Sequence, residues 1–210
     1  MTIPDPTHIK STWEAKVFPT CIEATAGEGG PAPPTGPQLI QSWPVENQND
    51  IGSYGVQASM QAAYHAFTPS EDFQITSAKV SLKNVSGFVG PVTLNIYLAT
   101  GVIPDAKPIG SAIMTSSNID SAGVTSDPNG ALYEATFVML PANRQLRAGV
   151  TYCLTVQSAS VPAAPSALMV GFTFDFTNGA QAGNGGYKDA SGWGTDNACD
   201  MVFYLYGDRT

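Results

Sequence analysis

Apolar and polar residues alternate along several stretches of the chain, and the two clearest stretches predict β-strands. In residues 92–98 the aliphatic side chains occupy every second position, whereas polar residues and Tyr97 fall on the other side. Residues 168–176 repeat the same period and place Val170 and Phe172 on one side. Successive side chains of a strand point to opposite faces, so each stretch predicts a strand with one buried face.

Shorter stretches predict further strands around residues 78–82, 133–137 and 152–156. Residues 201–206 are apolar on both faces, which predicts a strand at the centre of its sheet. Residues 56–66 fit a helical face and a strand equally well. The apolar faces of the strands predict a core that includes Val80, Leu82, Leu94, Ile96, Phe137, Leu154, Val156, Val170, Phe172 and Phe174.

Strong turn signals separate these stretches, among them Gly-Pro at 90–91, Asp-Pro-Asn-Gly at 127–130 and Asn-Gly at 178–179. About eight strands at this spacing, without a long helical pattern, predict an all-β fold. We expect a single β-sandwich of jelly-roll or Greek-key type. No internal repeat is visible, which disfavours a propeller or a solenoid.

The N-terminal quarter of the chain differs from the rest. Eight of the sixteen prolines lie in residues 1–50, and proline is not tolerated in the interior of a sheet because it lacks the N–H donor. We therefore interpret residues 1–50 as an extended arm and residues 51–210 as the β-sandwich domain. The arm carries Trp13, Phe18 and Trp43, which we expect to anchor it on a partner because such a segment cannot bury them in a core of its own.

Composition and charge exclude several classes of partner. Only 12% of the residues are charged, and the formal net charge of −8 would repel a phosphate backbone, so nucleic acid is not expected. No apolar stretch reaches the length of about 18 residues that a membrane span needs. The N-terminus lacks a basic region followed by an apolar one, so we expect the protein to be made in a host cytoplasm without a signal peptide.

The residues that usually carry catalysis are few. His8 and His65 are the two histidines, and neither lies in a nucleophile or metal-binding motif. Glu134 and Asp175 lie on polar strand faces, where solvated charges are ordinary, although two acids would suffice for a glycosidase. We therefore expect no enzyme active site.

Metal and disulfide sites are not expected either. The chain has three cysteines, Cys21, Cys153 and Cys199. Their odd number and wide spacing predict free thiols rather than disulfides or a zinc site. Asp189, Asp196 and Asp200 could ligate calcium, but they lack the regular alternation of a calcium loop. No metal and no cofactor is predicted.

One glycine-rich segment, residues 185–197, has the composition of a binding loop. Tyr187 and Trp193 could stack on the apolar face of a sugar while Asp196 and Asn197 contact its hydroxyl groups. The alternative is structural: aspartate, asparagine and glycine form turns, and the two aromatic residues would then cap one end of the core.

The order of several segments resembles a known kind of module. These segments are Phe67 with residues 73–82, residues 92–97 followed by Pro104, residues 146–154, and Gly192-Trp193 followed by residues 200–203. Together they resemble the jelly-roll β-sandwich modules of bacteriophage virion proteins (decoration or attachment proteins) and of bacterial surface proteins. The resemblance covers roughly residues 54–207 and excludes the arm. It implies a fold more than a function, and the family has no common catalytic residues.

An inert domain with an aromatic arm suggests a structural role. The first hypothesis is a non-enzymatic virion structural protein, a capsid decoration (cement) protein or a related phage module. It would be located in the virion, bind other virion proteins and form a homo-oligomer. The second hypothesis is a carbohydrate-binding module that uses the loop at 185–197.

Overall fold

The computed structural model describes residues 36–43, 50–56, 60–85, 90–120, 133–140, 145–158, 167–174, 185–196 and 199–210. Residues 36–210 form one compact unit, and residues 1–35 lie outside that unit and outside the described residues. The described residues contain β-strands and turns but no helix, so the all-β prediction is confirmed.

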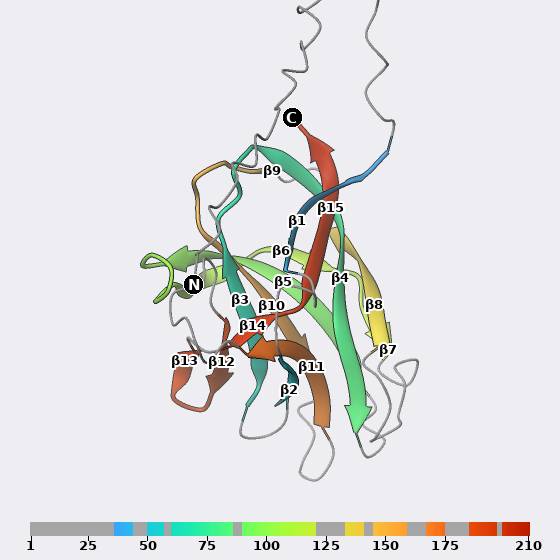
Figure 1. Cartoon of the computed structure of the whole chain (residues 1–210), viewed down its shortest axis with the longest axis vertical. Helices are drawn as coiled ribbons and strands as arrows, with labels where there is room; N and C mark the ends of the chain where they lie inside the picture. The colour runs from blue at the N-terminus through green and yellow to red at the C-terminus, as the bar shows by residue number, and fades with distance from the viewer. Residues whose placement is uncertain are drawn as a thin grey trace, which may run out of the picture. The chain divides into compact units, whose positions relative to one another are not determined.

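The strands form a large antiparallel sheet with two halves (Figure 1). The first half contains β1 (Gln38–Trp43), β2 (Asp50–Val56), β4 (Phe73–Val85), β8 (Tyr133–Leu140), β9 (Gln145–Leu146), β11 (Ala167–Phe174), β14 (Cys199–Met201) and β15 (Phe203–Arg209). The second half contains β3 (Ala62–Phe67), β5 (Pro91–Thr100), β6 (Lys107–Ser116), β7 (Ile119–Asp120), β10 (Tyr152–Ser158), β12 (Gly185–Asp189) and β13 (Gly192–Asp196).

The pairing order shows how the halves are built. In the first half the strands follow the order β1-β15-β4-β8, and β11 pairs with the far end of β4 as well as with β2 and β14. In the second half the order is β6-β5-β10-β3-β12-β13. The halves meet where β6 pairs with β8, through Thr115 opposite Leu140 and Ser116 opposite Met139.

The inner faces of the two halves enclose one hydrophobic core. Phe203 of β15 packs against Phe67 of β3, with ring centroids 5.9 Å apart, so side chains from both halves meet directly. Eight predicted core residues are buried and belong to this cluster: Val80, Leu82, Leu94, Ile96, Phe137, Leu154, Val156 and Val170. Phe172 and Phe174 lie in β11, but their side chains are outside the described set.

The structure also decides one ambiguous segment and tests one predicted central strand. Residues 62–67 form β3, so the helical alternative for this part of residues 56–66 is wrong. β15 lies between β1 and β4, which confirms a central strand near the C-terminus. The expected number of about eight strands is not confirmed by the described residues, which form fifteen strands.

Residues 38–43, which the sequence assigns to the arm, pair with β15 as a strand of the sheet. Trp43 is opposite Phe203 in this ladder, while its side chain lies outside the described set. Trp13 and Phe18 also lie outside the described residues, so an anchoring arm before Gly36 stays a prediction.

Candidate functional site

The predicted binding loop forms an antiparallel hairpin of β12 and β13 at the end of the second half. Asp189 builds its turn, because its carboxylate accepts hydrogen bonds from the backbone N–H groups of Ser191 (2.7 Å) and Gly192 (3.1 Å). Gly192 has a φ of +122°, which favours glycine at this position. Asp189 is therefore a turn-forming residue of the hairpin.

The hairpin register separates the two aromatic residues that the sequence groups together. Trp193 is opposite Lys188, whereas Tyr187 is opposite Gly194. Cross-strand partners share a face and successive residues alternate, so Trp193 and Tyr187 project from opposite faces. Gly194 shows this directly, because a Cβ atom there would contact the Tyr187 ring. The structure does not bring the two rings together as one stacking surface.

Trp193 lies in a second, smaller hydrophobic cluster on the outer face of the second half. Its ring makes edge contacts with Tyr64 (centroids 5.5 Å apart) and Tyr97 (6.0 Å). The ammonium group of Lys188 lies 5.5 Å from the Trp193 ring centroid. The cluster also contains Ala66, Ala106 and Cys153. These contacts favour the structural alternative for Trp193, in which it caps a core.

Replacing Trp193 with alanine should therefore lower the free energy of unfolding. We expect a loss of about 2 kcal/mol, roughly half the cost of truncating a fully buried aromatic side chain. Urea unfolding followed by circular dichroism measures the loss. Lys188→Ala is the matched control, because it removes only a half-exposed cation–π contact worth less than about 1 kcal/mol. Equal stability of the Trp193 variant and the wild type would show that the ring is not part of a core.

A row of polar side chains lies beside this cluster on the same face. The Asn95 amide donates to the Gln157 side-chain oxygen (3.2 Å), and the Gln157 amide donates to the Tyr97 hydroxyl (3.2 Å). Sequence reasoning did not select Asn95 and Gln157 as candidates. The signal for Asn95 was present in residues 92–98, whose polar positions and Tyr97 share the face opposite the core, and Gln157 lies on the corresponding side of residues 152–157.

A buried polar pair lies on the inner face where β3 meets β14. His65 and Asp200 are both buried, and His65 Nδ1 lies 3.6 Å from Asp200 Oδ1. His65 Nδ1 accepts a hydrogen bond from the Met201 backbone N–H (3.1 Å), which places the proton of the neutral ring on Nε2. Burial lowers the His65 pKa from 6.5 to about 3. His65 is therefore uncharged near neutral pH.

Both described cysteines are free and buried. Burial raises the pKa of Cys153 well above its ordinary value. The pKa of Cys199 is also raised, mainly by burial and further by the charge of Asp196 and its hydrogen bond to the thiol. Both groups are therefore thiols rather than reactive thiolates near neutral pH. The contact with Cys199 gives Asp196, one of the two predicted polar sugar contacts, a structural role. The other, Asn197, lies outside the described residues.

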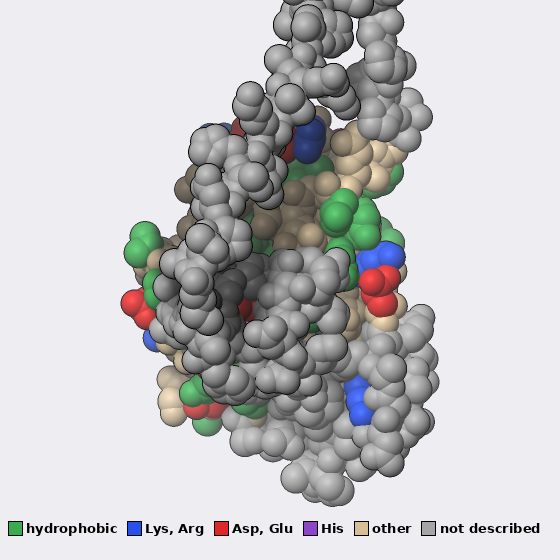
Figure 2. Space-filling view, in the orientation of Figure 1, with side chains coloured by type: hydrophobic (Ala, Val, Ile, Leu, Met, Phe, Trp, Pro, Cys, Tyr) green, Lys and Arg blue, Asp and Glu red, His purple; other side chains and the backbone are tan. Residues whose placement is uncertain are grey.

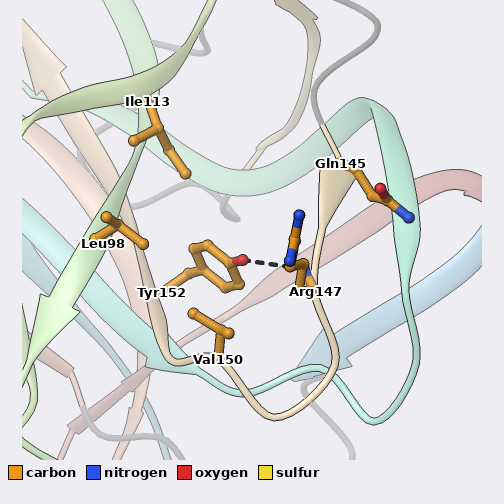
Figure 3. A pocket seen from close by; sticks show the side chains of 6 residues that line it. All are labelled: Leu98, Ile113, Gln145, Arg147, Val150 and Tyr152. Carbon is orange, nitrogen blue, oxygen red and sulfur yellow. Dashed lines mark hydrogen bonds between the residues drawn. The ribbon is translucent and has the colours of Figure 1, made fainter.

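The described residues form an open hollow of about 340 Å³ where the core reaches the surface. It is lined by Leu98, Ile113, Gln145, Arg147, Val150 and Tyr152. Figure 3 shows the Tyr152 ring in the middle of this group, with its hydroxyl toward Arg147, whose backbone N–H donates to it (3.0 Å). Ile113 and Val150 pack against the main core, so the hollow is a place where the core reaches the surface.

The comparisons with known proteins leave the family open. No family model matches the chain, and no curated protein is significantly similar to it. Within the described part of the chain, no three His, Cys, Asp or Glu side chains are grouped so that they could hold a metal ion. The same part contains no helix that is long and apolar enough to cross a membrane.

Proposed function

We propose that the protein is a non-enzymatic virion structural protein, a capsid decoration (cement) protein or a related phage module, attached through its N-terminal arm. The observation that carries the proposal is the pairing of β1 with β15. Residues 38–43 lie in the C-terminal part of the predicted arm (residues 1–50) and are held in the sheet by a ladder of paired residues from Gln38 to Trp43. A load on the arm would therefore be transmitted to the sheet through main-chain hydrogen bonds.

We further propose that eight strands form a jelly roll: β1, β3, β4, β5, β6, β8, β10 and β15. When these strands are numbered one to eight in chain order, the neighbours in the first half are the first, eighth, third and sixth. The second half pairs them as second, seventh, fourth and fifth. This order supports the proposal, because it is the pairing of the two sheets in a jelly roll. The remaining strands elaborate the connections, notably the one between β10 and β15.

The states of the reactive side chains also support a non-enzymatic role. The His65 imidazole is neutral, buried and engaged with a backbone amide. Burial holds Cys153 and Cys199 in the thiol form. Glu134 is half-exposed and paired with Lys79 at 2.7 Å, as an ordinary surface carboxylate is. Each of these groups has a structural partner or environment that explains its presence.

The virion role is tested on particles. Phage or phage-like particles from cells that carry the gene are purified on a density gradient, and the chain is quantified by mass spectrometry. We expect a fixed ratio between this chain and the major shell protein across gradient fractions. Absence of the chain from the particles, with the protein present elsewhere in the same cells, would refute the proposal.

Deleting residues 1–35 should separate attachment from folding. We expect a chain that starts at Gly36 to keep its melting temperature, because β1 and the core are intact, and to be lost from the particles. Deleting residues 1–44 is the informative comparison, since it removes β1 and should lower the melting temperature as well. If the chain from Gly36 onward still joins the particles at the wild-type ratio, the arm does not attach it.

Carbohydrate binding is the second proposed function, and it is supported by the partly exposed side chains of Gln157 and Tyr97, whereas Asn95 is buried beneath them. Amide and hydroxyl groups beside the half-exposed Trp193 are the kind of groups that contact sugars. A glycan array probed with the full chain tests this function. If the chain binds no glycan on the array but is found in the particles, the carbohydrate-binding function is refuted and the structural role remains.

A further inference from the structure

The turn between β5 and β6, residues 101–105, carries an exposed aliphatic side chain. Val102 is 75% exposed, and Ile109 (52%) is exposed on the strand that leaves the turn, whereas its cross-strand partner Leu98 (44%) lines the hollow. Figure 2 shows hydrophobic and acidic side chains beside each other at this turn. Clustered exposed aliphatic residues of this kind mark contact surfaces more often than isolated ones do.

The turn is held in one conformation. The backbone N–H of Asp105 donates to the carbonyl of Val102 at 2.8 Å. Ile103, in the middle of the turn, and Ala106, directly after it, pack in the outer hydrophobic cluster. Because Val102 is so exposed, it does not occupy the hollow of its own chain. An apolar side chain that is presented rigidly loses little conformational entropy when it binds.

The charges of the turn and the hollow are complementary. Asp105 is an exposed residue of the turn, and Arg147 is an exposed residue of the hollow. Considering only the part of the chain that the structure describes, neither forms an ion pair. In a chain with a net charge of −8, an arginine beside an apolar hollow favours an apolar group with a neighbouring carboxylate.

We propose that the partner of the hollow is a second copy of this chain. Val102 of one copy enters the apolar lining formed by Leu98 and Tyr152 of the next, and the Asp105 carboxylate pairs with the Arg147 guanidinium. The turn of one copy meets the hollow of the next, so the contact is heterologous and builds a ring or an open row of copies. It supplies lateral contacts, and it does not depend on the virion role or on the arm.

Two charge reversals test this contact without touching the core. Asp105→Arg brings two arginines together across the contact, and Arg147→Glu brings two carboxylates together. We expect the dissociation constant of self-association to rise about tenfold or more in each variant, as for other reversed charge pairs. Sedimentation velocity on the full chain, over a wide concentration range, measures it. An equimolar mixture of the two variants should associate again, because each type of contact in an alternating row then has opposite charges.

Val138→Asp is the matched control. Val138 is 55% exposed on the other half of the sheet, so this variant should associate like the wild type. A wild-type chain that stays monomeric overturns the proposal, as does association that both reversals leave unchanged. Saturable binding of octanoate to a monomeric chain, abolished by Arg147→Glu, would identify a small carboxylate as the occupant and also overturn it.

Discussion

Replacing Phe203 with alanine should lower the free energy of unfolding by about 3–5 kcal/mol, which is a large share of the stability of a typical domain. Phe203 is only 1% exposed, and its ring contacts Phe67 (5.9 Å) and His65 (4.9 Å) between centroids. Both partners lie on β3, whereas Phe203 lies on β15. The truncation would therefore leave a cavity where the two halves of the sheet meet.

Urea unfolding of the two proteins, monitored by circular dichroism, measures this loss. Val138→Ala serves as the control, since it shortens an exposed side chain and should change the stability by less than about 0.5 kcal/mol. A Phe203 variant as stable as this control would mean that the contact between β15 and β3 does not hold the halves together.

The buried face of most strands could be predicted from the sequence, because a period of two is a local property. Val80 and Leu82 alternate with Lys79 and Ser81, and the burial pattern follows that alternation. Pairing partners are not local. β15 lies between β1 and β4, which are separated from it by most of the chain, and no pattern within β15 names those neighbours.

The same limit explains why the sequence wrongly grouped the two aromatic residues of the predicted binding loop. Composition grouped Tyr187 with Trp193, but the register of a hairpin decides which face each side chain takes. The turn at Asp189 places Trp193 opposite Lys188, and the two aromatic rings then fall on different faces. Moving the register by one residue would have placed the two rings on the same face.

Some features of the fold depend on a close approach that no sequence pattern marks. Gly207 lies at an irregularity in the pairing of β15 with β4. A Cβ atom at this position would collide with the backbone of Gln74 and Ile75. From the sequence alone, a glycine at this position suggests that the strand is interrupted. In the structure it lets two backbones pass close to each other. β1 was missed for a different reason, because the prolines on both sides of residues 38–43 favoured an extended arm over a strand.

His65 should make the fold sensitive to acid. Its imidazole is neutral in the folded protein, with a pKa lowered to about 3, whereas in the unfolded chain the ordinary value of 6.5 applies. Below pH 6.5 the unfolded chain therefore binds a proton that the folded protein does not bind. Stability then falls as the pH decreases from 6.5 toward 3, by up to roughly 1.4 kcal/mol per pH unit for one group, and this loss ends below the folded pKa.

The cost of protonation has a structural origin that mutation can isolate. A proton on Nδ1 would break the hydrogen bond from the Met201 N–H, although the charge would be attracted by Asp200 at 3.6 Å. His65→Asn keeps an acceptor for that N–H but does not titrate, so its stability should fall less steeply with acid in urea unfolding series. In a His8→Asn background the single remaining imidazole can be followed by NMR. We expect no titration of the folded protein near pH 6.5, and a midpoint there would mean that Asp200 outweighs burial.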